Sequence, residues 1–535
     1  MKNFFKNKKF KYGSLGVVFT AAVVALLVVV NVIVYTLVYS NSWFFDMTGE
    51  QVYNVSEQTY AMLDTISPEH NNITIYFLAQ EDEMNMVATT GNSSSQTTLW
   101  GMKYVHSLAR ELEERYSFIK CEYIDLEKQP DVIKGIIGED YYEAASLNKY
   151  HIIIDNYTVE READGSIING TDGKPLYWHN FRIYNRNSFY AFDYTTSGTS
   201  YYVNAFKGDY RYCSAIMSVC NEKIPTAYFI SGHGEDIGSY TVGKQDSTYN
   251  YAQHLWQLFR DCGFNVKKID LQHEDFGNEE NAVAVIYSPE TDYSFNPEVS
   301  TNNELGKISA FLEKKGHSLM VYLDYGTQTL PNLESYLESS FGVSYQDAQI
   351  KDNGENSIDV NMLHIVGKLQ QDTSQTGYKV SAPIADSTKK IVFTNCRPIT
   401  VTDSSKTSTV VYAPTSSSAR YIDKTVSYAE GTPASLATIT KLSDSSYVFC
   451  AGCSYVTDVV FTDGGFYGNR DLLLSVIDAM SEEEAPINIE YKIIAGEGLD
   501  ITKGEAISAM ILISAVIPLA VAVAGMIVYV RRRHS

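Results

Sequence analysis

Two long apolar stretches, one near each end of the chain, constrain its fold more than any other feature. Residues 15–38 and residues 507–530 each run for 24 positions without a charged side chain. About 20 consecutive apolar residues are enough for a helix to cross a bilayer. The 535-residue sequence is therefore expected to form two transmembrane helices with one large body between them.

Basic residues flank both stretches on their outer sides. Five lysines lie within residues 1–12, and residues 531–534 read RRRH. Lys and Arg stay on the cytoplasmic side of a membrane. The first stretch is longer than the apolar core of a signal peptide and no small-residue cleavage motif follows it, which favours an uncleaved anchor. We expect a cell-membrane protein with both termini in the cytoplasm and the body, about residues 40–505, outside it.

The body is strongly acidic. The chain has a formal net charge of −22, and removing the eight basic charges of the two tails leaves about −30 on the remainder. A nucleic-acid-binding protein needs a basic face, so no nucleic-acid partner is expected. The seven cysteines are few and odd in number, which disfavours a disulfide framework in an exported body of this size.

Apolar runs and helical patterns alternate in the first part of the body. Residues 73–79, 121–126 and 151–155 are typical of strands, and residues 99–116 have the apolar spacing of a helix. This order predicts parallel strands joined by a crossover helix. A further helix, expected at 207–220, closes the region.

A second β-α series begins after Pro225. Its predicted strands are 227–230, 265–271, 282–288 and 317–325, with helices at 249–262 and 303–315 between them. The run at 282–288 is continuously apolar, as a strand covered on both faces must be. An open, doubly wound sheet is expected. Residues 345–445 show short strand patterns and no long helical period, and complete the domain.

The fold class is therefore α/β, with two exported α/β domains between two transmembrane helices. The expected organisation is a cytoplasmic basic tail 1–14, transmembrane helix 15–38, first extracytoplasmic α/β domain 39–222, second, Rossmann-like extracytoplasmic α/β domain 223–485, juxtamembrane segment 486–506, transmembrane helix 507–530 and cytoplasmic tail 531–535.

A glycine-framed loop follows the first strand of the second domain and is the candidate ligand- or partner-binding site. Its residues are Gly232, His233, Gly234, Glu235 and Asp236. Ligands of such sheets bind beyond the carboxyl ends of the strands, and glycines allow close backbone approach. Three roles remain open: a structural or interaction loop, ligand binding, and catalysis. One His-x-Glu supplies too few ligands for a catalytic zinc, and no cofactor is expected.

Other motifs argue against an enzyme. Hydrolases of this class carry a Ser or Cys on a sharp turn after a central strand, whereas the corresponding turn here offers Asp324 and Tyr325. Cys450 and Cys453 form a C-x-x-C, but at a strand end rather than at a helix N-terminus, where a redox thiol is activated. The phosphate-binding motif of P-loop ATPases is missing from the sequence, so the chain cannot drive transport alone.

The order of these pieces resembles the GldG-like auxiliary components of gliding-motility-associated ABC transport systems. The resembling segments are 73–77, 122–131, 206–235, 282–324, 393–399 and 468–480. The chain departs from the family where Gly316-His317 replaces a glycine pair and Cys396-Arg397 replaces Ser-Arg. Its first domain has no C-x-x-C.

The resemblance implies a thioredoxin-like first domain and an amidotransferase-like, non-catalytic second domain. It also implies a membrane subunit that works beside a separate ABC ATPase and a permease, with an undefined ligand. Two alternatives remain from the residues themselves. One is a membrane-tethered extracytoplasmic hydrolase that uses the Gly-His-Gly-Glu loop, and the other is a structural envelope protein.

Overall fold

The computed structural model divides into two compact units, Met1–Tyr53 and Asn54–Ser535. It describes residues 51–494, except 86, 91–97, 161, 163–165, 171–172, 195–200, 222, 236, 239–250, 295–302, 327–328, 353, 355–361, 429–432 and 482–484. Outside that range it describes only positions 25, 26, 29, 32, 33, 525 and 528. The expected membrane spans, 15–38 and 507–530, therefore lie almost wholly outside the described residues. Among the described residues, no helix has both the length and the apolar character needed to cross a bilayer.

The first sheet of the larger unit has the strand order β4-β1-β5-β6. Its strands are β1 (Ile73–Phe77), β4 (Ile119–Tyr123), β5 (Ile152–Val159) and β6 (Tyr177–Tyr184). Strands β1 and β4 are parallel and are joined through α3 (Met102–Arg115). One face packs on α4 (Pro130–Ile137) and α5 (Glu139–Ala144) through a core that includes Ile133, Ile136 and Ile153.

The prediction of parallel strands is correct for β1 and β4 but wrong for β5. Strand β5 runs antiparallel to β1, and β6 runs antiparallel to β5. The connection from β4 through α4 and α5 passes over β1 and re-enters the sheet at the end where β4 left it, so β5 runs opposite to both strands. The apolar run at 151–155 identifies a buried strand, but it carries no information on direction.

The second sheet has the order β10-β9-β11-β12-β23-β22-β18-β13. Its first five strands are parallel: β9 (Thr226–Ser231), β10 (Asn265–Asp270), β11 (Ala282–Tyr287), β12 (His317–Tyr322) and β23 (Ser446–Ala451). Every residue of β9, β11, β12 and β23 is buried, whereas the edge strand β10 is largely exposed. The continuous apolar runs thus mark the strands that lie between other strands and between layers.

The remaining strands of this sheet are antiparallel and come from the region with the least legible sequence pattern. They are β13 (Val343–Tyr345), β16 (Lys368–Leu369), β18 (Ile399–Val401), β19 (Thr407–Tyr412) and β22 (Ser435–Ser443), with β16 and β19 attached beside β22. Smaller elements of the same region are β14 (Gln349–Asp352), β15 (His364–Val366), α10 (Thr376–Ser381), η4 (Ala382–Ile384), β17 (Val392–Thr394), β20 (Ser417–Arg420) and β21 (Thr425–Ser427).

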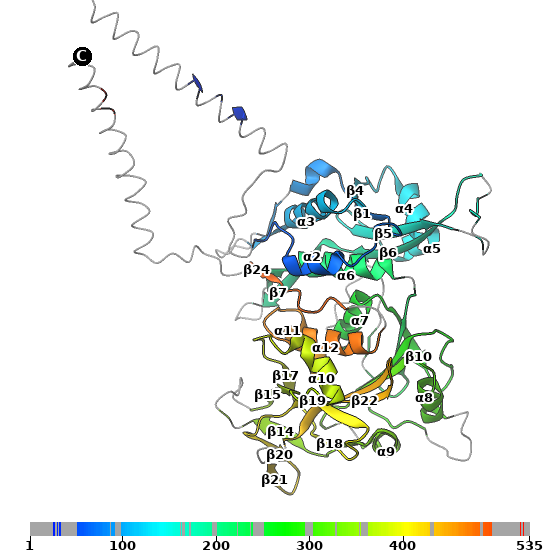
Figure 1. The fold of residues 1–535 in the computed structure, drawn as a ribbon, viewed down its shortest axis with the longest axis vertical. Helices are drawn as coiled ribbons and strands as arrows, with labels where there is room; N and C mark the ends of the chain where they lie inside the picture. Colours follow the sequence, from blue (N-terminus) through cyan, green and yellow to red (C-terminus); the bar gives the residue numbers. More distant parts are fainter. Residues whose placement is uncertain are drawn as a thin grey trace, which may run out of the picture. The chain divides into compact units, whose positions relative to one another are not determined.

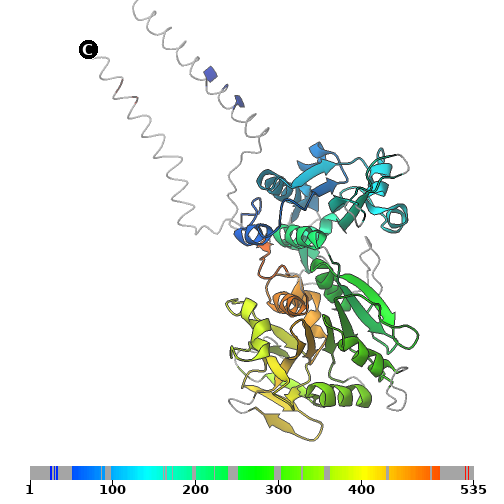
Figure 2. The same cartoon turned by 45° about the vertical axis from the view of Figure 1, so that its right-hand side comes forward.

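Helices cover both faces of the parallel strands, as two neighbouring residues of β9 demonstrate. Phe229 contacts Trp256 and Phe259 of α7 (Tyr251–Asp261), with ring centroids 5.0 and 6.0 Å away. Tyr228 points to the other face and meets Phe311 of α8 (Glu304–Leu312) at 6.4 Å. Figures 1 and 2 show this green-to-orange region with α7 and α12 (Asn469–Ala479) in one layer.

The two sheet regions meet at α6 (Gly208–Cys220), which is buried along nearly its whole length and contacts α7. Two ion pairs hold this junction, and three of their four side chains are buried. Arg211 lies 2.5 Å from Asp261 of α7, and Lys207, just before α6, lies 2.6 Å from Asp463. Burial lowers the pKa of Lys207, although the neighbouring Asp463 carboxylate opposes that effect.

A third buried pair joins the two ends of the described body. Lys492 lies 2.5 Å from Asp209 of α6 and also donates to the backbone oxygen of Asn54. The other oxygen of Asp209 accepts the N–H of Ser56 at 2.5 Å. Lys492 belongs to β24 (Lys492–Ile493), which pairs with β8 (Tyr201–Phe206) beside β7 (Tyr190–Tyr194). Residues 492–493, which were expected to lie in the juxtamembrane segment, thus pair with a strand of the first half of the body.

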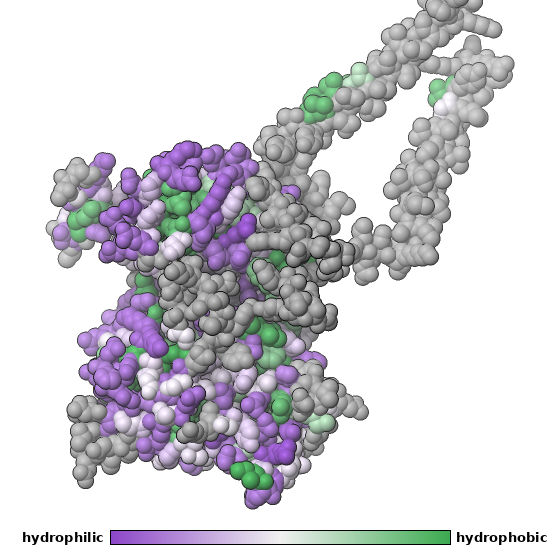
Figure 3. All heavy atoms as spheres, turned by 180° about the vertical axis from the view of Figure 1, so that it is seen from behind, coloured by the Kyte–Doolittle hydropathy of each residue, from purple (hydrophilic) through white to green (hydrophobic). Residues whose placement is uncertain are grey.

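Hydrophilic residues predominate on the face of the body drawn in Figure 3, with small groups of hydrophobic residues among them. Charged residues on such a surface form weak pairs. Lys223 and Glu280, for example, pair with side chains that are 66% and 74% exposed. At the junction, by contrast, the side chains of Arg211, Asp261 and Lys207 are only 2–6% exposed. Breaking a buried pair there should cost more free energy of unfolding than breaking a surface pair.

Replacing Arg211 by Ala should lower the free energy of unfolding by about 3–5 kcal/mol, because it leaves the Asp261 carboxylate buried without its cation. The matched control is Lys223→Ala, which breaks the exposed pair with Glu280 and should cost less than about 1 kcal/mol. Urea titrations of the full-length variants measure both values. A loss for Arg211→Ala no larger than that of the control would show that the junction does not depend on this pair.

Candidate functional site

The Gly-His-Gly-Glu loop lies at the point where the chain changes direction across the parallel strands. From β9 the chain goes through α7 to β10 on one side, and then to β11 on the other side of β9. The loop follows β9 directly, and residues 288–294 follow β11. In sheets of this order, ligands enter the crevice between these two loops.

Positive backbone angles at two glycines shape the loop. Gly232 has φ +114° and Gly234 has φ +85°, which side-chain-bearing residues rarely adopt. A Cβ atom at Gly234 would also lie 2.9 Å from the side chain of Glu290. The two turns place the His233 side chain inward, where it is 1% exposed.

Three side chains surround the His233 ring. Its Nδ1 donates to Oε1 of Glu235 at 3.1 Å. Its Nε2 lies 2.9 Å from Oε1 of Glu304, an ion-pair contact without hydrogen-bond alignment. The ring stacks on Tyr293 with centroids 3.9 Å apart and planes 15° apart. We call His233, Glu235, Tyr293 and Glu304 the histidine clasp.

Backbone hydrogen bonds complete the clasp. The carbonyl oxygen of His233 accepts the N–H groups of Glu290 at 2.7 Å and Thr291 at 3.0 Å, which fastens the loop after β9 to the loop after β11. Glu235 accepts the N–H of His233 at 2.7 Å and the hydroxyl of Tyr293 at 3.1 Å. The chain's own side chains therefore fill the crevice where related sheets hold a ligand.

The electrostatics of the clasp favour a charged imidazolium. Burial alone would lower the pKa of His233, but the adjacent carboxylates of Glu235 and Glu304 outweigh it and raise that pKa to about 9. Burial would raise the pKa of Glu304, yet its contact with His233 leaves that pKa below the usual value. Burial, with Glu235 nearby, holds the pKa of Tyr293 well above its ordinary range, so its hydroxyl remains a donor.

This arrangement is poor for chemistry. A protonated ring cannot serve as a general base, and both of its nitrogens face carboxylates rather than a hydroxyl or thiol. The two carboxylates lie against different ring nitrogens, so they do not converge on one cation. No group of three or more His, Cys, Asp or Glu side chains in the described part of the chain is placed to hold a metal ion.

Four of the five predicted site residues, Gly232, His233, Gly234 and Glu235, lie together in this loop, and Asp236 lies outside the described residues. No pattern in the sequence indicated Tyr293 and Glu304 as their partners. Glu304 follows Asn303, whose side chain caps α8 by accepting the N–H of Gly306 at 2.7 Å. An acidic residue in a first helical turn is ordinarily explained by the helix dipole, which conceals its second role.

Asp324 occupies the turn after β12 where a nucleophile was sought. It accepts the hydroxyl of Ser288 at 2.6 Å, and the N–H and hydroxyl of Ser454 at 2.6 and 2.7 Å. The carboxylate therefore ties together the carboxyl ends of β11, β12 and β23. These contacts give Asp324 a structural role.

The C-x-x-C motif is buried. Cys450 lies within β23 and Cys453 directly after it, and neither side chain reaches solvent. Burial raises the pKa of the Cys450 thiol to about 12, which disfavours the reactive thiolate.

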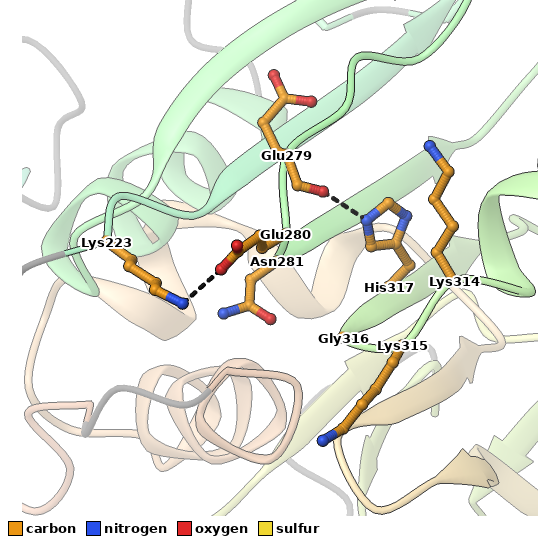
Figure 4. A pocket seen from close by; sticks show the side chains of 8 residues that line it. All are labelled: Lys223, Glu279, Glu280, Asn281, Lys314, Lys315, Gly316 and His317. Carbon is orange, nitrogen blue, oxygen red and sulfur yellow. Dashed lines mark hydrogen bonds and ion pairs between the residues drawn. The ribbon is translucent and has the colours of Figure 1, made fainter.

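A pocket of about 320 Å³ lies at the opposite, amino-terminal edge of the parallel strands (Figure 4). Lys223, Lys314, Lys315, Glu279 and Glu280 are among its lining residues. Lys223 pairs with Glu280, while Lys314 and Lys315 point away from each other. With three lysines and two glutamates, the charges of the lining nearly balance.

No family model and no curated protein matches the sequence. Among solved structures, the chain is similar to an "mmIFT52 N-terminal domain", with 11% identity, a TM-score of 0.34 and coverage of 48% of this chain and 97% of that one. It is also similar to "Agd3 a novel carbohydrate deacetylase", with 12% identity, a TM-score of 0.23 and coverage of 43% and 29%. At these scores neither similarity carries an argument about fold or function.

Stability should depend on pH through His233. The pKa is about 9 in the folded state and about 6.5 in an unfolded chain. The stabilisation is therefore complete below pH 6.5 and lost as the pH rises through 9. The difference in unfolding free energy between wild type and His233→Gln should shrink by about 2–3 kcal/mol between pH 6 and pH 10.

The control for this measurement is His273→Gln, since the His273 side chain is 76% exposed and pairs with Asp270 at the surface. Its difference from wild type should change by less than about 0.5 kcal/mol over the same range. A His233→Gln difference that is constant with pH would contradict a charged imidazole in the clasp.

Gly234→Ala should destabilise the protein by about 1–2 kcal/mol or more, because Ala is disfavoured at this φ and its Cβ would meet Glu290. The matched control is Gly135→Ala in α4, where a Cβ would meet nothing within 4 Å. That change should stabilise the helix by up to about 1 kcal/mol. Thermal and urea unfolding of both variants give the comparison, and equal effects would contradict the special geometry at Gly234.

Proposed function

We propose that the protein is a non-catalytic, membrane-anchored auxiliary subunit of an ABC-type transport system. Its extracytoplasmic body binds a partner or ligand, and its two terminal spans pack beside the permease. A separate ATPase supplies the energy, since the sequence has no phosphate-binding loop of its own.

The histidine clasp is the observation that carries the proposal. An enzyme of a doubly wound fold uses the crevice at the direction change of the sheet for its substrate. Here a buried, doubly paired imidazolium and a stacked tyrosine occupy that crevice. Such a site favours a body that presents a fixed surface over one that turns over a substrate.

The convergence of the chain ends supports the anchored part of the proposal. Lys492 donates to the backbone oxygen of Asn54, and both Lys492 and Ser56 bind the carboxylate of Asp209 in α6. The chain thus enters and leaves the body at one place. That arrangement is compatible with a body suspended from two adjacent membrane spans.

The finer fold and location belong to the same proposal. We infer a thioredoxin-like first domain at 39–222 and an amidotransferase-like second domain at 223–485, both outside the cytoplasm. The parallel strands with helices on both faces are consistent with the second assignment. The first has one parallel pair, β1 and β4, with the antiparallel strands β5 and β6 beside it.

Affinity purification of the full-length chain from its native membranes tests the proposal. We expect a P-loop ATPase and a polytopic permease to co-purify in defined stoichiometry, as identified by mass spectrometry. The purified complex should hydrolyse ATP. An unrelated two-span membrane protein carrying the same tag is the control for detergent carry-over.

A second arm separates the hydrolase alternative. The isolated full-length chain is assayed with ester, amide and glycoside substrates, alongside His233→Ala. We expect no turnover that depends on His233. Isolation of the chain without ATPase and permease, together with turnover abolished by His233→Ala, would overturn the auxiliary role.

A further inference from the structure

A second pocket, of about 620 Å³, lies on the antiparallel side of the second sheet. It is bounded by β16, by the segment that leads into β17, and by the end of β19. Strand β16 pairs with β19, and the N–H of Gly367 donates to Ile391 at 2.8 Å. Its volume falls within the range of about 300–1,000 Å³ typical of small-molecule sites.

The inner wall of this pocket is apolar. Val366, Leu369, Ile391, Ala413 and Pro433 contribute to it, and Ile391 and Ala413 are buried. The backbone at 367 packs tightly on the sheet, since a Cβ there would lie 2.3 Å from Val411. The wall is therefore rigid and suited to an apolar ring or short chain.

Three lysines supply the charge of the pocket, and none of its lining residues is acidic. Lys389 forms an ion pair with Glu490 at 3.2 Å. The side chains of Lys368 and Lys390 are exposed and form no ion pair within the part of the chain that the structure describes. In a body with a large negative charge, this concentration of uncompensated ammonium groups favours an anion locally.

One hydroxyl in the lining is arranged to donate. The buried Gln370 donates its Nε2 to the hydroxyl oxygen of Tyr412 at 2.9 Å. Gln370 is itself fixed, because its Oε1 accepts the N–H groups of Gln371 and Asp372 at 3.0 Å each. The hydrogen of the Tyr412 hydroxyl is then available to an acceptor such as a carboxylate.

We propose that this pocket binds a small organic anion with an apolar body. The acid group lies between Lys368 and Lys390 and accepts from Tyr412, and the apolar part packs on the wall. Only a few placed polar groups are needed to orient such a ligand. The proposal goes beyond the transporter role and does not depend on it, because binding is a property of the chain itself.

The pocket of Figure 4 provides the contrast. It also presents lysines, but two glutamates are part of its lining, and one of them, Glu280, pairs with Lys223. Local charge balance, rather than the number of lysines, therefore distinguishes the two sites. Lys314 and Lys315 are the matched control positions.

Calorimetric titration of the full-length chain in nanodiscs, with empty nanodiscs as the blank, tests the proposal. The probes are 2-naphthoate and its uncharged analogue 2-naphthamide, which have nearly the same shape. We expect 2-naphthoate to bind with one site per chain, and 2-naphthamide to bind about tenfold more weakly. The double variant Lys368→Ala/Lys390→Ala should lose about tenfold in affinity for 2-naphthoate while its affinity for 2-naphthamide is unchanged.

The control variant Lys314→Ala/Lys315→Ala should bind both probes like wild type. Three results would overturn the proposal: no measurable binding of 2-naphthoate, equal affinity for the two probes, or equal losses in the two double variants. Each is distinguishable from failure of the transporter role, which is measured by co-purification and not by these titrations.

Discussion

The buried charges of α6 are the constraint on which the arrangement of the body depends. Lys207, Asp209 and Arg211 follow one another at alternate positions, and each pairs with a different segment of the chain. A buried charge without its partner is costly, so each pair must form before the folded state is favourable. Together they determine where α7, residue 463 and β24 lie relative to the helix. Apolar packing alone would leave these positions less specified.

Sequence patterns correctly predicted the elements that one local property determines, such as continuous burial or a glycine at a helix end. The continuous apolar runs of β9, β11 and β12 mark buried parallel strands, and the glycine after α7 marks its end. Helix α9 (Pro331–Phe341) was not recognised, although Pro331 begins it and Gly342, with φ +69°, ends it. Only Leu333, Leu337 and Phe341 of this helix are buried, so its apolar pattern is too short to stand out in the sequence.

Long-range pairing was the part that sequence patterns could not supply. The direction of β5 depends on the reversal at α4 and α5, and the clasp depends on residues 58 and 69 positions beyond Glu235, Tyr293 and Glu304. Neither relation produces a periodic pattern in the sequence. The candidate loop was therefore located correctly at a strand end, while its chemical character came from neighbours that only the fold brings near.

The clasp also changes how the glycine-framed loop should be understood. Glycines and a histidine at a strand end are usually associated with an open site, because they permit close approach and proton transfer. In this protein they instead close the site, because the two turns direct the imidazole of His233 inward, between Glu235 and Glu304. The crevice is closed by an internal ion cluster, whereas the surface pocket beside β16 and β19 offers an apolar wall and three lysines, and none of its lining residues is acidic.

The pairing of β24 with β8 has a consequence for biosynthesis. Residues 205–206 pair with residues 492–493, so the sheet of β7 and β8 gains its third strand only after residues 492–493 have been synthesised. Domains otherwise tend to fold in order of synthesis, from the N-terminus. Until Lys492 has been synthesised, Asp209 lacks this cation, so the first half of the body completes its contacts only after the second half has been made.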